Sequence, residues 1–386
     1  MVMGKRPDVA RSSWPVAATD MAGLVGQIGI SMLQVPFRRP WSGEGGVARN
    51  VAVAVTRQTV RTFMGYSTSL PIEQFRSIEV ILDDLCTVVM PPAVRAWNVS
   101  HGHGEVAGVA GEWFRPRSDR SGGTILYLHG GGYVGTSPKM YSVFIAQLAR
   151  RTGCDVFVPD LRLAPEFPFP ANLEDATAAG YGLIDDGIDP QSIFIAGDSS
   201  GGGLVTSVVH ARIQEAHPRI AGVLLFSPEV NLRLDCPSVR DNAGRDILPW
   251  NIPTSSYLNG IDPGSSQVSA ISDDLTGWPA TFVSFGSDEM FRDAIRRFST
   301  HLHDAEIDPV VVLEEPGMFH VFPILLPWTD AARRTMVAAG KFVRARLDEL
   351  GQAEDNASDA AVVGDGVVEG EDVVIDTPDP WASVPG

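Results

Sequence analysis

Residues 193–201, with the sequence IFIAGDSSG, decide the fold of this chain. The first four residues are apolar and predict a buried strand, and a helical pattern begins directly after the first serine. Glycines stand two positions before and two positions after Ser199, at Gly197 and Gly201. This pattern is typical of a sharp turn from strand to helix, where the backbone approaches its neighbours too closely for a Cβ and a serine hydroxyl is exposed. The spacing to both glycines selects Ser199, rather than Ser200, as the candidate nucleophile.

Short apolar runs alternate with helical patterns on both sides of this turn, from about residue 97 to residue 350. Buried strands that alternate with helices predict an α/β fold with a doubly wound, mostly parallel sheet. The turn-rich sequence HGHG at residues 101–104 is expected to join the first two strands. Residues 1–95 fit the alternation poorly and are expected to form a separate, largely helical covering element. We expect strands at residues 97–100, 109–115, 124–129, 155–159, 192–196, 222–226, 281–285 and 310–314, and helices at residues 138–151, 171–185, 200–214, 290–303 and 329–350.

A second motif, HGGG at residues 129–132, ends one of these expected strands. Three successive glycines leave backbone N–H groups free to face a developing oxyanion, with no side chain in the way. The alternative interpretation is a flexible loop.

A third motif, DLRLAPE at residues 160–166, is followed by FPA at residues 169–171. Together with HGGG and GDSSG it resembles the hormone-sensitive-lipase branch of the α/β-hydrolases, the bacterial family IV esterases, over about residues 97–350. Leu161 stands where that family usually has tyrosine, and Ser200 where it commonly has alanine. Neither departure removes a reacting group. The resemblance implies an α/β-hydrolase fold.

The same resemblance implies an oxyanion hole formed by the backbone N–H groups of Gly131, Gly132 and Ser200. His129 is expected to brace the glycine loop, and we interpret Asp198, which precedes the nucleophile, as structural.

Arg162 and Glu166 lie in the third motif and carry opposite charges. We expect them to pair and hold their loop, in preference to a role in substrate binding.

A serine hydroxyl is a weak nucleophile until a base takes its proton, so a histidine held by a carboxylate is required. The chain order in α/β-hydrolases is serine, acid, histidine. His301 and His303 fall at the end of an expected helix and are interpreted as surface residues. His320 follows the last expected strand, where the family places its catalytic imidazole, and is our candidate base.

The candidate acids are the adjacent Asp288 and Glu289. Neighbouring side chains on an extended turn point in different directions, so only one of them can meet the imidazole. Many family members have DPLRD here, with the catalytic aspartate four residues before a second acid, and Glu289 stands four residues before Asp293. The sequence resembles the G-S-x-E variant of the family, in which glutamate serves. We therefore favour Glu289, with Asp288 as the alternative, and expect the other acid to be structural or solvated.

The family covers its site with a cap, and the resemblance implies that residues 1–95 and the insertion at residues 231–279 form it here. Apolar side chains under a cover suit an acyl chain, although each of them also suits a core position. The candidates are Phe37, Trp41, Phe63, Met64, Phe75, Trp250 and Tyr257.

Composition and charge exclude other classes. The 386 residues are 44% hydrophobic and 20% charged, as in globular domains, and a net charge of −17 argues against a nucleic-acid partner. Residues 351–386 hold nine acids and no Lys or Arg, and are predicted to be an acidic disordered tail. The cysteines are odd in number and widely spaced, at Cys86, Cys154 and Cys236, so they predict neither disulfides nor a zinc site. With no signal peptide recognised, this cysteine usage predicts a cytoplasmic location.

Residues 21–37 carry no charge but include several polar residues and glycines, and they are too short and too polar for a membrane span. We expect one helical stripe, which includes Leu24 and Ile28, to pack on the protein's own core in preference to a membrane surface.

The sequence thus predicts a serine carboxylesterase that hydrolyses short- to medium-chain acyl esters through an acyl-enzyme, with no metal or organic cofactor. The catalytic candidates are Ser199, Glu289 and His320. One alternative is an amidase or formamidase with the same triad. Another is a non-catalytic ligand receptor on the hydrolase fold, although such receptors lose the histidine. The expected partner is a small-molecule ester, and the family resemblance leaves a homodimer open.

Overall fold

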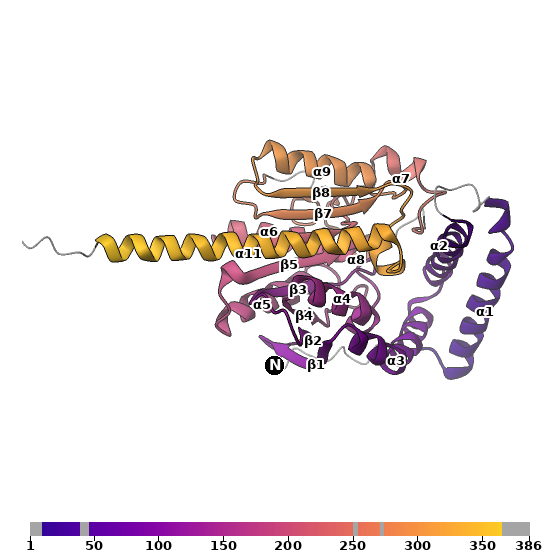
Figure 1. Ribbon diagram of the computed structural model, residues 1–386. Coiled ribbons are helices and arrows are strands. Elements are labelled where there is room, and N and C mark those ends of the chain that lie inside the picture. The colour runs from indigo at the N-terminus through magenta and orange to yellow at the C-terminus, as the bar shows by residue number, and fades with distance from the viewer. Residues whose placement is uncertain (1–9, 39–45, 250–253, 271–273, 365–386) are drawn as a thin grey trace, which may run out of the picture. The chain divides into compact units, whose positions relative to one another are not determined.

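The computed structural model of the chain describes residues 10–38, 46–249, 254–270 and 274–364. An eight-stranded sheet in the order β1-β2-β4-β3-β5-β6-β7-β8 forms its centre (Figure 1). The first two pairings in this order are antiparallel and the other five are parallel, so the predicted doubly wound α/β fold is confirmed. The strands are β1 (Val99–Val106), β2 (Val109–Pro116), β3 (Thr124–Leu128), β4 (Asp155–Pro159), β5 (Ile193–Asp198), β6 (Gly222–Phe226), β7 (Thr281–Gly286) and β8 (Val310–Glu315).

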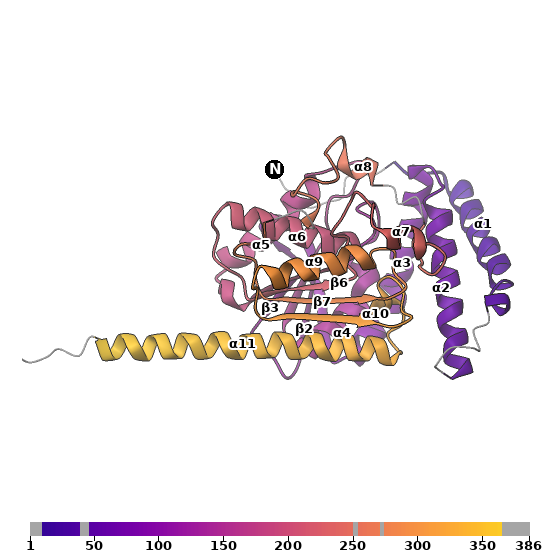
Figure 2. The same cartoon turned by 90° about the horizontal axis from the view of Figure 1, so that it is seen from above.

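Helices cover both faces of this sheet, which is why β3, β5, β6 and β7 are buried along their whole length. Figure 2 shows α5 (Ala171–Asp185), α6 (Ser199–Gln214) and α9 (Arg292–Asp304) over one face. On the opposite face, Phe144 of α4 (Ser142–Thr152) packs edge-to-face on Phe226, and Phe342 of α11 (Asp330–Gly364) contacts Phe194 and Phe282.

The described part of the segment before the sheet, residues 10–38 and 46–96, is largely helical, as expected for residues 1–95. It contains α1 (Trp14–Met32), α2 (Val47–Ser67) and α3 (Ile72–Ala96), with the short 3-10 helix η1 (Pro36–Arg38) between the first two. Both views show α1 alongside α2 (Figures 1 and 2). Leu24 of α1 is buried, whereas Val25 and Leu33 are 63% and 71% exposed, so only part of the predicted apolar stripe packs on the protein. Within the described residues, none of the helices has the length and apolar character that spanning a membrane requires.

The remaining described helices are short. They are the 3-10 helices η3 (Pro138–Tyr141) and η4 (Pro190–Ser192), together with α7 (Pro237–Asp241), α8 (Ser255–Leu258) and α10 (Phe322–Leu325). Both α7 and α8 belong to the insertion between β6 and β7.

The HGHG sequence at residues 101–104 is not a turn, and this prediction is wrong. It lies inside β1, and the hairpin turns instead at Ala107 and Gly108, whose φ angles of 50° and 80° suit a tight two-residue connection. Gly104 serves packing across the pair, because a Cβ there would lie 2.5 Å from the Trp113 ring, whereas a Cβ at Gly102 would have no neighbour within 4 Å.

The closing helix also differs from its expected bounds. We expected it to end at residue 350 and to be followed by a disordered tail, but α11 continues to Gly364. Residues 352–363 contain no glycine or proline, so nothing in that stretch interrupts a helix. This extension belongs to residues 348–386, the second of two units into which the chain divides. The rest of the predicted tail, residues 365–386, lies outside the described residues.

Arg162 and Glu166 do not pair as predicted. Arg162 donates to Asp175 and Glu174 of α5, and Glu166 accepts two hydrogen bonds from Arg76 of α3, at 3.0 and 2.7 Å. The motif loop therefore connects to the N-terminal helices, a contact between distant parts of the chain that sequence spacing does not show.

Candidate active site

The candidate nucleophile lies at the turn between β5 and α6. Ser199 is the first residue of α6 and has a φ of 53°, in the left-handed region that a serine rarely adopts. The flanking glycines make the turn sterically feasible, since a Cβ at Gly201 would lie 2.1 Å from the Leu128 carbonyl oxygen. The N–H of Ser200 belongs to the first turn of α6, where helical N–H groups have no partner within the helix.

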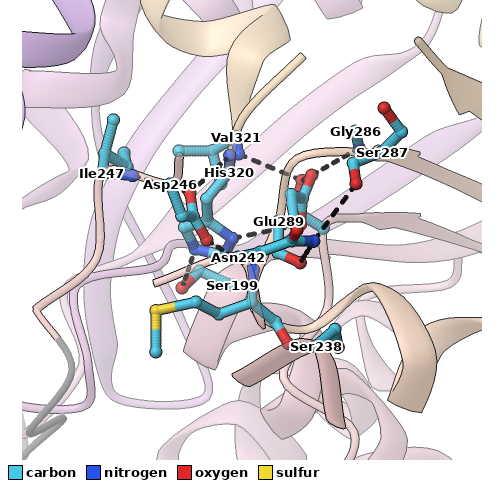
Figure 3. Close-up of polar contacts among 12 residues, drawn as sticks. Ser199, Ser238, Asn242, Asp246, Ile247, Gly286, Ser287, Glu289, His320 and Val321 are labelled. Carbon is cyan, nitrogen blue, oxygen red and sulfur yellow. Dashed lines mark hydrogen bonds and ion pairs between the residues drawn. The ribbon is translucent and has the colours of Figure 1, made fainter. Parts of the chain in front are cut away.

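The structure brings Ser199, His320 and Glu289 together, although 121 residues separate the serine from the histidine. The Ser199 Oγ lies 2.8 Å from His320 Nε2, and His320 Nδ1 lies 3.3 Å from Glu289 Oε2 (Figure 3). With its proton on Nδ1, the imidazole donates to the carboxylate and accepts from the serine hydroxyl. Both His320 and Glu289 are buried.

Glu289, and not Asp288, is the acid that faces the imidazole. Glu289 Oε1 also accepts hydrogen bonds from Ser227 Oγ at 2.7 Å and from the Gly286 N–H at 2.6 Å. Asp288 instead forms an ion pair with Arg57 of α2 at 3.2 Å. Three groups therefore fix the orientation of the Glu289 carboxylate, and Asp288 connects the same loop to the N-terminal helices.

Several charges act on the imidazole. Burial by itself lowers the pKa of His320, but the hydrogen bond and charge of Glu289, with the charges of Asp246 and Asp198, outweigh it and hold this pKa above its usual value. Burial raises the pKa of Glu289, and the hydrogen bonds from His320 and Ser227 oppose this rise. The imidazole is therefore a stronger base than a free histidine.

The glycine loop lies directly against the nucleophile. A Cβ at Gly130 would be 3.0 Å from the Ser199 Cβ. Gly131 and Gly132 have φ angles of 127° and 64°, and in the described part of the chain neither N–H donates to another group. Backbone of this kind presents N–H groups to an anion near the serine.

Two residues brace this loop. Asp198 accepts hydrogen bonds from the Gly130 N–H, at 3.0 Å, and from the hydroxyls of Tyr127 and Tyr141. Burial raises the pKa of Asp198 to about 6, against the opposing effect of these three donors. The His129 Nδ1 lies 3.0 Å from the Gly130 carbonyl oxygen and 2.9 Å from the Thr136 hydroxyl. These contacts agree with the structural interpretation of both residues.

The structure adds buried polar residues that the sequence analysis missed. Ser227 follows β6, and its hydroxyl both donates to Glu289 and accepts from the Val321 N–H at 3.0 Å. Asp246, in the insertion before β7, accepts from the His320 N–H at 3.0 Å. Glu229 is buried near His320, and burial raises its pKa to about 8. None of these three residues belongs to a recognised motif. The only sequence feature that could have indicated them is their position shortly after a strand or within the insertion.

The candidate cap residues have different surroundings. Phe75 of α3 lies against Gly135, three residues after the glycine loop, since a Cβ at Gly135 would lie 2.7 Å from its ring. Tyr257 of α8 is buried and stacks on Tyr133 at 3.7 Å, whereas Phe37 is 86% exposed. Phe63 is half-buried, and Met64 packs against the main core. Trp41 and Trp250 lie outside the described residues.

Of the two histidines interpreted as surface residues, His303 is exposed and His301 is half-buried. His301 and His303 lie in the last turn of α9. Within the described ranges, no group of three or more His, Cys, Asp or Glu side chains is arranged to hold a metal ion.

Comparison with known proteins identifies the fold and relatives that are esterases. The family model of the α/β-hydrolase fold matches residues 125–324. An acetyl-hydrolase of Streptomyces hygroscopicus is 34% identical over 242 residues, which are 62% of this chain and 80% of that protein. An esterase of Acinetobacter venetianus is 29% identical over 272 residues, or 69% of this chain and 88% of that protein. Among solved structures, an esterase of the bacterial hormone-sensitive lipase family is 27% identical with a TM-score of 0.63, and the match covers 87% of this chain and 99% of that one.

Proposed function

The chain belongs to the α/β-hydrolase family as a carboxylic-ester hydrolase of the hormone-sensitive-lipase type, and we propose that it cleaves short- to medium-chain acyl esters through a triad of Ser199, His320 and Glu289. The observation that carries this proposal is the 2.8 Å contact between Ser199 Oγ and His320 Nε2. A serine within hydrogen-bond reach of a histidine, itself held by a carboxylate, is the arrangement that activates a hydroxyl.

In the proposed reaction, His320 Nε2 takes the proton of Ser199 as Oγ attacks the ester carbonyl. The negative charge develops on the carbonyl oxygen, and the N–H groups of Gly131, Gly132 and Ser200 stabilise it there. Removal of one such donor typically reduces turnover by about 10²–10³. His320 then protonates the departing alcohol, which leaves an acyl group on Ser199. A water molecule, deprotonated by His320, attacks this ester and releases the acid and the free serine.

Glu289 stabilises the imidazolium that forms in both halves of the reaction. Its carboxylate also holds the proton of the neutral ring on Nδ1, which leaves Nε2 free to accept from the serine. The bonds from Ser227 and Gly286 keep that carboxylate in one orientation.

We propose that the N-terminal helices and the insertion at residues 231–279 form the cap that selects the acyl chain. Support comes from Phe75, which lies against Gly135 shortly after the glycine loop, and from Tyr257, which stacks on Tyr133 directly after that loop. The name of the Streptomyces relative, an acetyl-hydrolase, supports the short end of the chain-length range.

The first experiment is to incubate the protein with a fluorophosphonate and measure its intact mass, with Ser199→Ala as the matched control. We expect one adduct on the wild type and none on the variant, because only an activated serine reacts. Absence of an adduct on folded wild-type protein would favour the non-catalytic receptor instead.

A series of p-nitrophenyl esters from acetate to laurate then tests the chain-length proposal. We expect kcat/KM to fall beyond medium chains. Faster cleavage of a matched anilide than of its ester would favour the amidase alternative.

Two further proposals rest on the sequence alone. The cysteine usage supports a cytoplasmic location, and the family resemblance supports a homodimer, which light scattering would test.

A further inference from the structure

One buried carboxylate in the insertion connects the two loops that carry the proposed base and acid. Asp246 is fully buried. Its Oδ1 accepts from the His320 N–H at 3.0 Å (Figure 3), and its Oδ2 accepts from the Met290 N–H at 2.7 Å. Met290 directly follows Glu289, so one planar group contacts the backbone of both loops at the positions that decide the triad geometry.

Asn242, one turn earlier in the same segment, binds the acid loop from its carbonyl side. Its Nδ2 donates to the Glu289 carbonyl oxygen at 2.8 Å and to the Ser287 carbonyl oxygen at 3.2 Å. The acid loop is therefore held by both its carbonyl and its N–H groups. Because buried backbone groups cost free energy when unpaired, these bonds leave the loop few alternative positions.

The N-terminal helices hold this segment in turn. Arg61 of α2 donates to the carbonyl oxygens of Ala243 and Asp246, at 2.6 and 2.8 Å. Nearby on the same helix, Arg57 donates to Asp288 and to the Gly317 carbonyl oxygen. The helix thus contacts the acid loop, the histidine loop and the segment between them.

We propose that Asp246 is a positioning residue, which fixes His320 and Glu289 relative to each other through these two backbone hydrogen bonds and favours the imidazolium through its negative charge. This inference rests on the proposed triad. Asp246 does not contact the reacting atoms and acts only through the two residues that do.

The Nδ1–Oε2 distance of 3.3 Å in the triad is at the long end of the hydrogen-bond range, so a small displacement of either loop would break the contact. Misplacement of a catalytic group by about 1 Å can reduce turnover by about 10²-fold. The charge of Asp246 acts on the imidazole in the same direction as that of Glu289, because both raise the pKa of His320. Removal of Asp246 should therefore change both the rate and its pH dependence.

The test is the variant Asp246→Asn, assayed with p-nitrophenyl butyrate. Asparagine keeps the shape and one acceptor oxygen, but its amide nitrogen cannot accept from a backbone N–H. Asp293→Asn is the matched control, since Asp293 also accepts from a backbone N–H of the insertion, that of Ser238 at 2.9 Å, but contacts neither His320 nor Glu289.

We expect kcat of Asp246→Asn to fall by about 10- to 100-fold with KM changed less than about threefold, and Asp293→Asn to keep kcat within about twofold of the wild type. The pKa on the acid limb of kcat/KM should move down. Glu289, Asp198 and Glu229 are the other carboxyl groups that interact electrostatically with His320, and all three stay in place in this variant. A downward shift would therefore report the loss of the Asp246 charge or of the His320–Glu289 contact that Asp246 holds.

A role limited to folding would reduce the number of active molecules without a change in pKa. Active-site titration with the fluorophosphonate separates these cases. An unchanged kcat and pKa, or a loss of kcat fully matched by fewer titrated sites, would overturn the proposal. If Asp246→Asn does not fold, Arg61→Ala replaces it, because this change loosens the segment and keeps the carboxylate. A fall in kcat per titrated site would support the proposal, and an unchanged value would overturn it.

The two proposals fail in different ways. Hydrolysis retained by Ser199→Ala would overturn the proposed triad itself. An inactive Ser199→Ala beside a fully active Asp246→Asn would overturn only the role of Asp246.

Discussion

The carboxylate of Asp198 accepts a hydrogen bond from the Gly130 N–H at 3.0 Å. The residue before the candidate nucleophile therefore holds the loop that presents the candidate oxyanion donors. The two parts that must meet at the substrate carbonyl are connected by a buried contact between neighbouring strand ends.

This contact predicts different results for two substitutions of Asp198. Asparagine can keep the oxygen that accepts from Gly130 and Tyr127, whereas alanine leaves these donors and the Tyr141 hydroxyl unpaired. Each unpaired buried donor costs about 1–3 kcal/mol. We expect Asp198→Ala to lower the free energy of unfolding in urea and to reduce kcat by at least about tenfold, with smaller effects for Asp198→Asn. Equal stability and activity of the two variants would contradict this.

Separate alanine substitutions distinguish the two adjacent acids. Glu289→Ala should reduce kcat by about 10³–10⁴, because the imidazole loses the group that orients it and stabilises its positive charge. Asp288→Ala removes the partner of Arg57 and should change kcat by less than about tenfold. Steady-state kinetics with one ester decides between them, and a larger loss for Asp288→Ala would transfer the acid role to that residue.

The pH profile should report the environment of His320. Only the neutral imidazole can accept the serine proton, so kcat/KM falls as pH drops through the pKa of His320. The net effect of Glu289, Asp246 and Asp198 holds this pKa above its usual value, so the acid limb should have its midpoint above about 6.5. Glu289→Gln should move the residual activity's midpoint down. A wild-type midpoint below the pKa of a free histidine would show that the effect of burial on the pKa of His320 outweighs that of the carboxylates.

Glu229 should make the fold less stable at alkaline pH. Burial raises its folded pKa to about 8, whereas the unfolded chain has a glutamate pKa near 4.3. Between these values the unfolded state loses its proton first, so stability falls as pH rises through this window and stays low above it. The free energy of unfolding, measured in urea at pH 4.5 and at pH 8.5, should fall more between these pH values for the wild type than for Glu229→Gln. Glu105 is exposed, and Glu105→Gln should lose as much stability between these pH values as the wild type does. Parallel pH dependence of all three proteins would rule this prediction out.

The strands and helices of residues 97–350 were predictable because each carries its own pattern. Short apolar runs identified β3 to β8, and several predicted bounds differ from the structure by only one or two residues. The HGHG segment failed because glycine is ambiguous in a sequence: it permits a turn, but it also makes room for a large side chain on the next strand, as Gly104 does for Trp113.

The candidate site was only partly predictable for a related reason. Ser199 and the glycine loop lie in local motifs whose backbone demands are visible in the residues themselves. Asp246, Ser227 and the contacts of Arg57 and Arg61 carry no such signal, because a polar residue in a long insertion has the same appearance whether it is solvated or buried against a loop far away in sequence.

The sequence by itself determined that the chain forms an α/β sheet with a serine at a strand-to-helix turn, since local sterics and hydrophobic periodicity act between near neighbours. For the candidate acid it left two adjacent residues, of which it favoured Glu289 over Asp288. Only the tertiary structure decided that Glu289 faces His320 while Asp288 pairs with α2. That choice depends on how β7, the insertion and the N-terminal helices pack, and the direction of a side chain on a turn is fixed by partners that only the folded chain brings together.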